Sequence, residues 1–217
     1  MHRVVGFDLD GTLFDDRQYV RAGLERAGAE LASITGQDLT DHLLEAYFDR
    51  GITEGTFDTV LAEHDLSQRH VSRLVDAYHD TDGELTPYPG VRPTLRTLGR
   101  CYTLAVITGG RNGTDKLDRL GLAEYLDTVI VTTNRSDSKR DPGPFVALLD
   151  RHDVSPSAVA YVGDRPELDF PQPNALGMDT VRVLTGRYAD APASGTASPD
   201  ATVSALTELP ATLLELD

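Results

Sequence analysis

Short apolar runs alternate with stretches of helical periodicity along most of this chain, and this alternation restricts its fold more than any other feature. Five runs have the length and β-branched composition of buried strands: residues 3–8, 102–108, 127–132, 158–163 and 180–184. Between the last four runs, residues 114–120, 145–152 and, more weakly, 169–176 have the spacing of helices. Such alternation produces parallel βαβ units with right-handed crossovers. The sequence therefore predicts an α/β fold with a doubly wound, Rossmann-like parallel sheet, completed by a short strand near 201–204 and a helix from Glu208.

The segment between the first two predicted strands is different, because it contains no convincing strand. Its apolar residues recur at helical spacing, which predicts helices over residues 17–35, 39–50, 53–63 and 67–82. This segment is too long for an ordinary crossover between strands. We therefore predict two domains: a core formed by residues 1–15 and 87–217, and an inserted α-helical cap domain formed by residues 16–86.

Two aspartates follow the first predicted strand, in the segment Asp8-Leu9-Asp10-Gly11-Thr12. In an open α/β sheet, ligands bind at the carboxyl edge of the strands. Residues two apart on a strand point the same way, so both carboxylates can reach one centre. Two like charges at this distance are costly unless a cation or a reaction uses them. The alternative interpretation is a solvated pair that caps the next helix.

Polar groups also follow the later predicted strands. A hydroxyl and flexible backbone follow the second strand, a lysine follows the third, and two carboxylates follow the fourth: Thr108-Gly109-Gly110, Lys139, and Asp164 with Asp169. Backbone amides and a lysine bind phosphate, and carboxylate oxygens are preferred ligands of Mg²⁺. Taken singly, these are also compatible with an ordinary turn, a surface lysine and a helix cap. Together they predict a metal and phosphate site at one edge of the sheet.

The charge of the chain excludes one class of partner and draws attention to two residues. The 217 residues include 35 acidic and 20 basic ones, for a formal net charge of −15. Nucleic-acid phosphates require a basic surface, so we expect no nucleic-acid partner. Only Lys116 and Lys139 are lysines. An acidic, lysine-poor composition predicts a halophilic protein from a salt-loaded cytoplasm, in which each remaining lysine is a candidate for a specific role.

Apolar segments and cysteines indicate the compartment. No apolar stretch approaches the roughly 18 residues of a membrane span, and the N-terminus lacks a signal-peptide pattern. We therefore expect a soluble, cytoplasmic protein without a membrane partner. Cys101 is the only cysteine, which rules out an internal disulfide, and we expect it to be a small core residue.

The polar strand ends, taken in order, resemble the four motifs of the haloacid dehalogenase-like hydrolase superfamily. The matching segments are Asp8-Leu9-Asp10-Gly11-Thr12-Leu13, Ile107-Thr108-Gly109-Gly110, Lys139-Arg140-Asp141-Pro142, and Val162-Gly163-Asp164 with Asp169. The helical insertion resembles the family's type 1 cap. The sequence departs from the family pattern at Arg140, where a proline is usual, and Arg165-Pro166 stiffens the fourth motif.

The resemblance implies a role for each motif residue. Asp8 would attack phosphorus and form an aspartyl-phosphate, and Asp10 would protonate the leaving oxygen and then activate water. Mg²⁺ would be held by the Asp8 carboxylate, the Asp10 backbone carbonyl and Asp164, with Asp169 as a further metal partner, directly or through water. Thr108, the Gly109 amide and Lys139 would hold the other phosphate oxygens.

The resemblance thus implies a Mg²⁺-dependent phosphatase that hydrolyses a small phosphorylated metabolite of the sugar phosphate, phosphoglycolate or nucleotide class. The alternatives are a phosphoryl-transferring mutase of the same superfamily, a 2-haloacid dehalogenase, a receiver-type signalling domain and a non-catalytic binding protein. The family's true dehalogenases lack an acid at the position of Asp10, because halide leaves without a proton, and a receiver domain carries its phosphoryl acceptor on a later strand. Monomer and homodimer both remain open.

Overall fold

The computed structural model describes residues 1–134 and 137–216. In it, the chain divides into two compact units: Met1–Asp16 together with Leu85–Asp217, and Arg17–Glu84. Within the described residues, no helix is long and apolar enough to cross a membrane. Each unit has its own arrangement of secondary structure.

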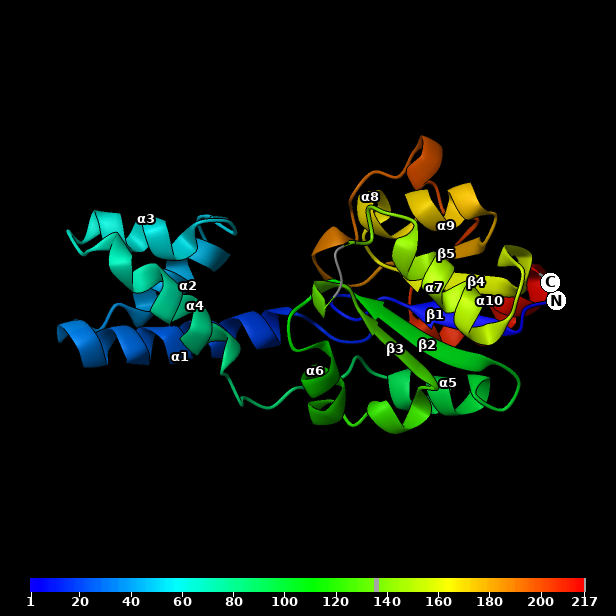
Figure 1. The fold of residues 1–217 in the computed structure, drawn as a ribbon, viewed down its shortest axis with the longest axis horizontal. Helices are drawn as coiled ribbons and strands as arrows, with labels where there is room; N and C mark the ends of the chain where they lie inside the picture. Colours follow the sequence, from blue (N-terminus) through cyan, green and yellow to red (C-terminus); the bar gives the residue numbers. More distant parts are fainter. Residues whose placement is uncertain (135–136, 217) are drawn as a thin grey trace. The chain divides into compact units, whose positions relative to one another are not determined.

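The first unit is built on a six-stranded parallel sheet with strand order β3-β2-β1-β4-β5-β6 (Figure 1). The strands are β1 (Val4–Phe7), β2 (Thr103–Thr108), β3 (Thr128–Val131), β4 (Val159–Gly163), β5 (Asp179–Val183) and β6 (Ala201–Val203). β1 and β4 are buried at every position, as expected for apolar strands in a sheet covered on both faces. The predicted α/β class with a parallel sheet is confirmed.

Helices cover both faces of this sheet, with α7 and α9 on one side and α5 and α6 on the other in Figure 1. The helices are α5 (Val91–Leu98), α6 (Gly113–Arg119), α7 (Gly143–His152), α8 (Pro166–Asp169), α9 (Pro171–Leu176) and α10 (Leu209–Leu216). Short 3₁₀ turns connect them: η2 (Ala123–Tyr125), η3 (Thr132–Asn134), η4 (Pro156–Ala158), η5 (Gly186–Tyr188), η6 (Gly195–Ala197) and η7 (Leu206–Glu208). One part of the core packs Phe145 and Leu148 of α7 against Tyr161 of β4.

The second unit is entirely helical in its regular structure. It contains α1 (Arg17–Thr35), α2 (Thr40–Phe48), α3 (Thr56–Glu63), η1 (Gln68–His70) and α4 (Val71–His79). Val20, Leu24, Ala27 and Leu31 of α1 are buried at three-to-four spacing, which gives this helix a continuous apolar face. Leu43 and Leu74 from α2 and α4 are fully buried in the same cluster.

Three local expectations differ from the structure. The segment predicted as one weak helix over 169–176 forms two, because Pro171 has no amide hydrogen and begins a new helix after Phe170. Helix α5 was not anticipated at all. Cys101 is exposed rather than buried, because it lies in the turn between α5 and β2, where its amide bonds to the Leu98 carbonyl.

Candidate active site

The register of the central strands brings the predicted polar groups to one edge of the sheet. Phe7 at the end of β1 pairs with Val106 of β2 on one side and with Val162 of β4 on the other. Asp8 follows β1, and its amide donates to the Val162 carbonyl at 2.8 Å. Asp164 follows β4 directly. Residues far apart in the sequence therefore meet at the carboxyl edge.

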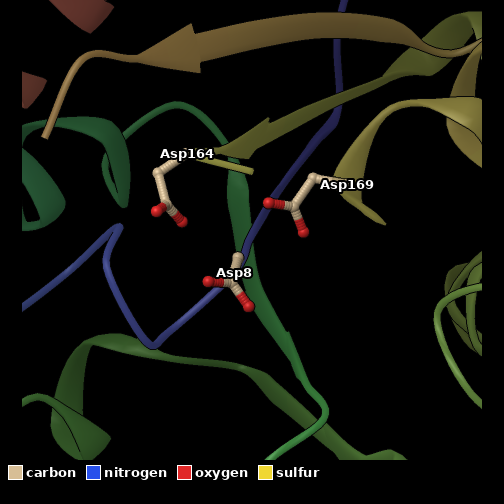
Figure 2. Close-up of side chains that lie close together, drawn as sticks. All are labelled: Asp8, Asp164 and Asp169. Carbon is tan, nitrogen blue, oxygen red and sulfur yellow. The ribbon is translucent and has the colours of Figure 1, made fainter. Parts of the chain in front are cut away.

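Three carboxylates form a buried cluster at this edge. Ligand oxygens of Asp8, Asp164 and Asp169 all lie within 4.8 Å of one another, and Figure 2 shows the three side chains converging. Their exposed fractions are only 6%, 1% and 0%. Burial raises the pKa of Asp8 to about 7 and that of Asp164 to about 8, and the neighbouring carboxylates add to the effect. The cluster thus requires positive charge to remain ionised at neutral pH.

Lys139 supplies part of that charge. It lies in the turn before α7 and is 2% exposed. Its Nζ donates to Oδ1 of Asp8 and, at 2.9 Å, to Oδ1 of Asp169. Burial acts to lower the pKa of Lys139, but the carboxylates of Asp169 and Asp8 outweigh it and raise that pKa well above its usual value. One ammonium against three carboxylates leaves two negative charges, which matches the charge of a divalent cation.

The donor set around Asp164 fits such a cation. Its Oδ1 accepts a hydrogen bond from the Thr12 hydroxyl at 3.0 Å, whereas its buried Oδ2 has no hydrogen-bond partner among the described residues. Gly11 faces this carboxylate with a φ of +93°, and a Cβ there would collide with it. An unsatisfied carboxylate oxygen beside Asp8, in a space kept free by a glycine, has the hard oxygen chemistry that Mg²⁺ prefers.

Asp169 is engaged differently from the other two members. Its Oδ1 accepts from Lys139, and its Oδ2 accepts from the backbone amide of Arg165 at 2.9 Å. Both oxygens thus have protein donors, and Asp169 holds Lys139 in place. Its role as a metal partner stays a prediction.

The side chain of Asp10 lies outside the three-carboxylate cluster. Lys116 donates to its Oδ1 at 2.6 Å, and the Thr108 hydroxyl donates to its Oδ2 at 3.2 Å. For the metal contact predicted at Asp10, this leaves the backbone carbonyl. The hydroxyl of Thr108, predicted to hold phosphate, is directed at Asp10 in this structure. The two aspartates of the first motif therefore have separate sets of partners.

Lys116 is a site residue that sequence reasoning did not place. It lies on α6 and is 5% exposed, and its only advance signal was the scarcity of lysine in this chain. Its contact with Asp10 spans 106 residues of sequence. Gly110 allows the approach, since a Cβ at this position would come within 3.0 Å of both Asp10 and Lys116.

These groups surround a pocket of about 290 Å³. Its lining includes four predicted site residues from the ends of β1 and β2 and from the Lys139 turn: Asp8, Asp10, Gly109 and Lys139. Asp164 and Asp169 line it as well, so that carboxylates, a lysine and glycine backbone face one small space. Several aspartate carboxylates and a candidate cation site thus share this space, and we interpret it as the candidate active site of an α/β hydrolase.

Comparison with known proteins identifies the family. Residues 5–183 match the haloacid dehalogenase-like hydrolase family, and the chain belongs to it. The family expectation from the four motifs is confirmed.

Individual relatives have two different chemistries. Glyceraldehyde 3-phosphate phosphatase from Methanopyrus kandleri is 33% identical over 205 residues, covering 88% of this chain and 87% of that protein. (S)-2-haloacid dehalogenase 1 from a Pseudomonas species is 31% identical over 229 residues, covering 99% of this chain and 97% of that protein. The crystal structure of 2-haloacid dehalogenase from Pseudomonas syringae pv. tomato aligns with a TM-score of 0.73 at 26% identity over the whole of both chains. Sequence similarity therefore does not decide between a phosphate ester and a halide as the substrate, and this choice rests on the residues of the site.

Proposed function

We propose that this protein is a Mg²⁺-dependent phosphomonoesterase that hydrolyses a small phosphorylated metabolite through an aspartyl-phosphate. The observation that carries the proposal is the Asp10 carboxylate, which lines the same pocket as Asp8 and is held by Lys116 and Thr108. An acid in this place serves a leaving group that must be protonated.

Asp8 is the nucleophile of the proposed reaction. Its carboxylate attacks phosphorus, the bond to the ester oxygen breaks, and an acyl phosphate forms on Asp8. Lys139, which contacts the Asp8 carboxylate, keeps a positive charge beside the transferring group. Asp8, Asp164 and the Asp10 carbonyl would hold Mg²⁺, which when bound neutralises the carboxylates and the phosphoryl oxygens.

Asp10 distinguishes a phosphatase from a dehalogenase. An alkoxide is a poor leaving group until it receives a proton, whereas halide departs without one. In the proposed reaction Asp10 gives its proton to the ester oxygen and then takes one from the water that hydrolyses the acyl phosphate. Its separation from the Asp8 cluster, with Lys116 and Thr108 as its own partners, supports this division of roles.

The other predicted binding groups complete the proposal. The Gly109 amide and Lys139 hold the phosphate oxygens that do not react, while the Thr108 hydroxyl donates to Asp10. The helical unit Arg17–Glu84 acts as a cap that selects the leaving group. The net charge of −15 and the presence of only two lysines support a halophilic, cytoplasmic protein.

A phosphate-release screen tests the proposal. Purified protein is incubated at high salt with a panel of phosphorylated metabolites and 2-haloacids, with Mg²⁺ or with a chelator, and Asp8→Asn is the control variant. We expect phosphate release that requires both Mg²⁺ and Asp8, and no halide release. Release that Asp8→Asn matches, halide release alone, or no turnover of any phosphate ester would overturn the proposal.

A further inference from the structure

Two arginines and a tyrosine of the active-site pocket have no part in the chemistry proposed above. Arg165, Arg187 and Tyr188 line the same pocket as Asp8 and Lys139. Arg165 immediately follows Asp164 after β4, and Arg187 and Tyr188 belong to η5, which follows β5. Strands β4 and β5 are neighbours in the sheet, so the two segments meet at one side of the pocket.

Both guanidinium groups lie against the ring of Tyr188. The Cζ atom of Arg165 is 4.8 Å from the ring centroid, and that of Arg187 is 5.6 Å from it. Contact with an aromatic ring stabilises a guanidinium without occupying the N–H groups along its edge. Those N–H groups form the planar donor pair that binds carboxylate or phosphate.

Arg165 differs from the other cations of the site in its pairing. Lys139, Lys116 and Arg187 each contact an aspartate carboxylate. The guanidinium of Arg165 has no carboxylate partner anywhere in the described part of the chain, although acidic residues outnumber basic ones by 35 to 20. Its backbone is fixed, because its amide donates to Asp169 and Pro166 follows it. A fixed, half-buried cation without a protein anion beside a reactive centre indicates an anion on the ligand.

We propose that Arg165 is a specificity residue that binds a second acidic group of the substrate, either a carboxylate or another phosphate. The inference rests on the proposed phosphatase function and narrows its substrate class. The pocket of about 290 Å³ is slightly smaller than the usual range of ligand sites, about 300 to 1,000 Å³. The substrate is accordingly a short phosphorylated acid or a short bisphosphate rather than a neutral phosphate ester.

Matched pairs of substrates test this inference. Phosphoglycolate is compared with hydroxyethyl phosphate, which has an alcohol in place of the carboxylate, and propanediol bisphosphate is compared with hydroxypropyl phosphate. Steady-state kinetics at fixed salt are measured for the wild type, Arg165→Met, Arg165→Lys and Arg100→Met. Arg100 is an exposed arginine that does not line this pocket, so its variant makes the same charge change elsewhere.

We expect the wild type to prefer at least one acidic substrate by about tenfold or more in kcat/KM, since a charge-assisted hydrogen bond has this strength. Arg165→Met should remove this preference by raising KM for the acidic substrate, while kcat/KM for the neutral substrates stays within about threefold of the wild-type value. Arg165→Lys should restore part of the preference, and Arg100→Met should keep all of it. The pair that responds identifies carboxylate or phosphate. Equal wild-type rates within both pairs, or equal loss on acidic and neutral substrates in Arg165→Met, would overturn the inference while leaving the phosphatase proposal intact. No hydrolysis of any ester would overturn both.

Discussion

Replacement of Lys116 by methionine should disable the proton donor while sparing the nucleophile. The ammonium donates to Asp10 at 2.6 Å, and the Thr108 hydroxyl donates to the same carboxylate at the longer distance of 3.2 Å. General acid catalysis contributes about 10²- to 10⁴-fold in rate, and misplacing a catalytic group by about 1 Å costs up to about 10²-fold. Methionine fills the space of the lysine stem, but it cannot hold the carboxylate. We therefore expect kcat/KM on an alkyl phosphate to fall by about 10- to 100-fold.

The leaving group separates this effect from general damage to the fold. Nitrophenolate departs without a proton, so kcat/KM for nitrophenyl phosphate, which covers only the steps up to formation of the acyl phosphate, should fall by less than about threefold in Lys116→Met. Arg119→Met is the matched control, because Arg119 lies on the same helix and pairs with Asp115 at 3.1 Å. Steady-state kinetics on both substrates decide the matter. An equal loss of kcat/KM on alkyl and aryl esters would refute the role given to Lys116.

Three further predictions concern the metal site and the packing. Burial raises the pKa values of Asp8 and Asp164 to about 7 and about 8. Between about pH 5 and pH 8 the folded state therefore binds more protons than the unfolded state, and the free energy of unfolding, measured with a chelator present, should fall as pH rises through this range. Urea titrations should show this decline, with Asp164→Asn reducing it and added Mg²⁺ opposing it; a flat profile would contradict the pKa shifts. Gly11→Ala should abolish Mg²⁺ binding in calorimetry, because the new methyl group would collide with the Asp164 carboxylate, and unchanged affinity would refute the proposed metal position. Leu43→Ala empties a fully buried position and should lower the free energy of unfolding by about 2–5 kcal/mol, and a loss no larger than that of half-buried Leu44→Ala would contradict this packing.

The fold could be predicted because local and global signals agree in this chain. The runs ending at Phe7, Thr108 and Gly163 are apolar over a strand's length and are separated by helical stretches, so a parallel sheet follows. Helix α5 was missed, although Val91, Leu95 and Leu98 are buried on one face of it. It has only eight residues and follows directly after the segment Thr86-Pro87-Tyr88-Pro89-Gly90, so its periodic signal is weak.

The site was predictable only as far as strand ends define it. Asp8 and Asp164 follow neighbouring strands, and parallel pairing alone brings them together. Lys116 projects from a helix to Asp10, and no pattern in the sequence encodes a contact between residues so distant along the chain. The same holds for Arg165 and Tyr188, which meet only because β4 and β5 are adjacent.

The most direct test of the account is to trap the phosphoryl group on the enzyme. The protein is mixed with Mg²⁺ and a substrate radiolabelled in its phosphate, quenched with acid during turnover, and digested for peptide mapping. We expect the label on the peptide that contains Asp8, with the hydroxylamine sensitivity of an acyl phosphate, and no label in Asp8→Asn. Steady phosphate release with no labelled protein, or label on another residue, would contradict the account.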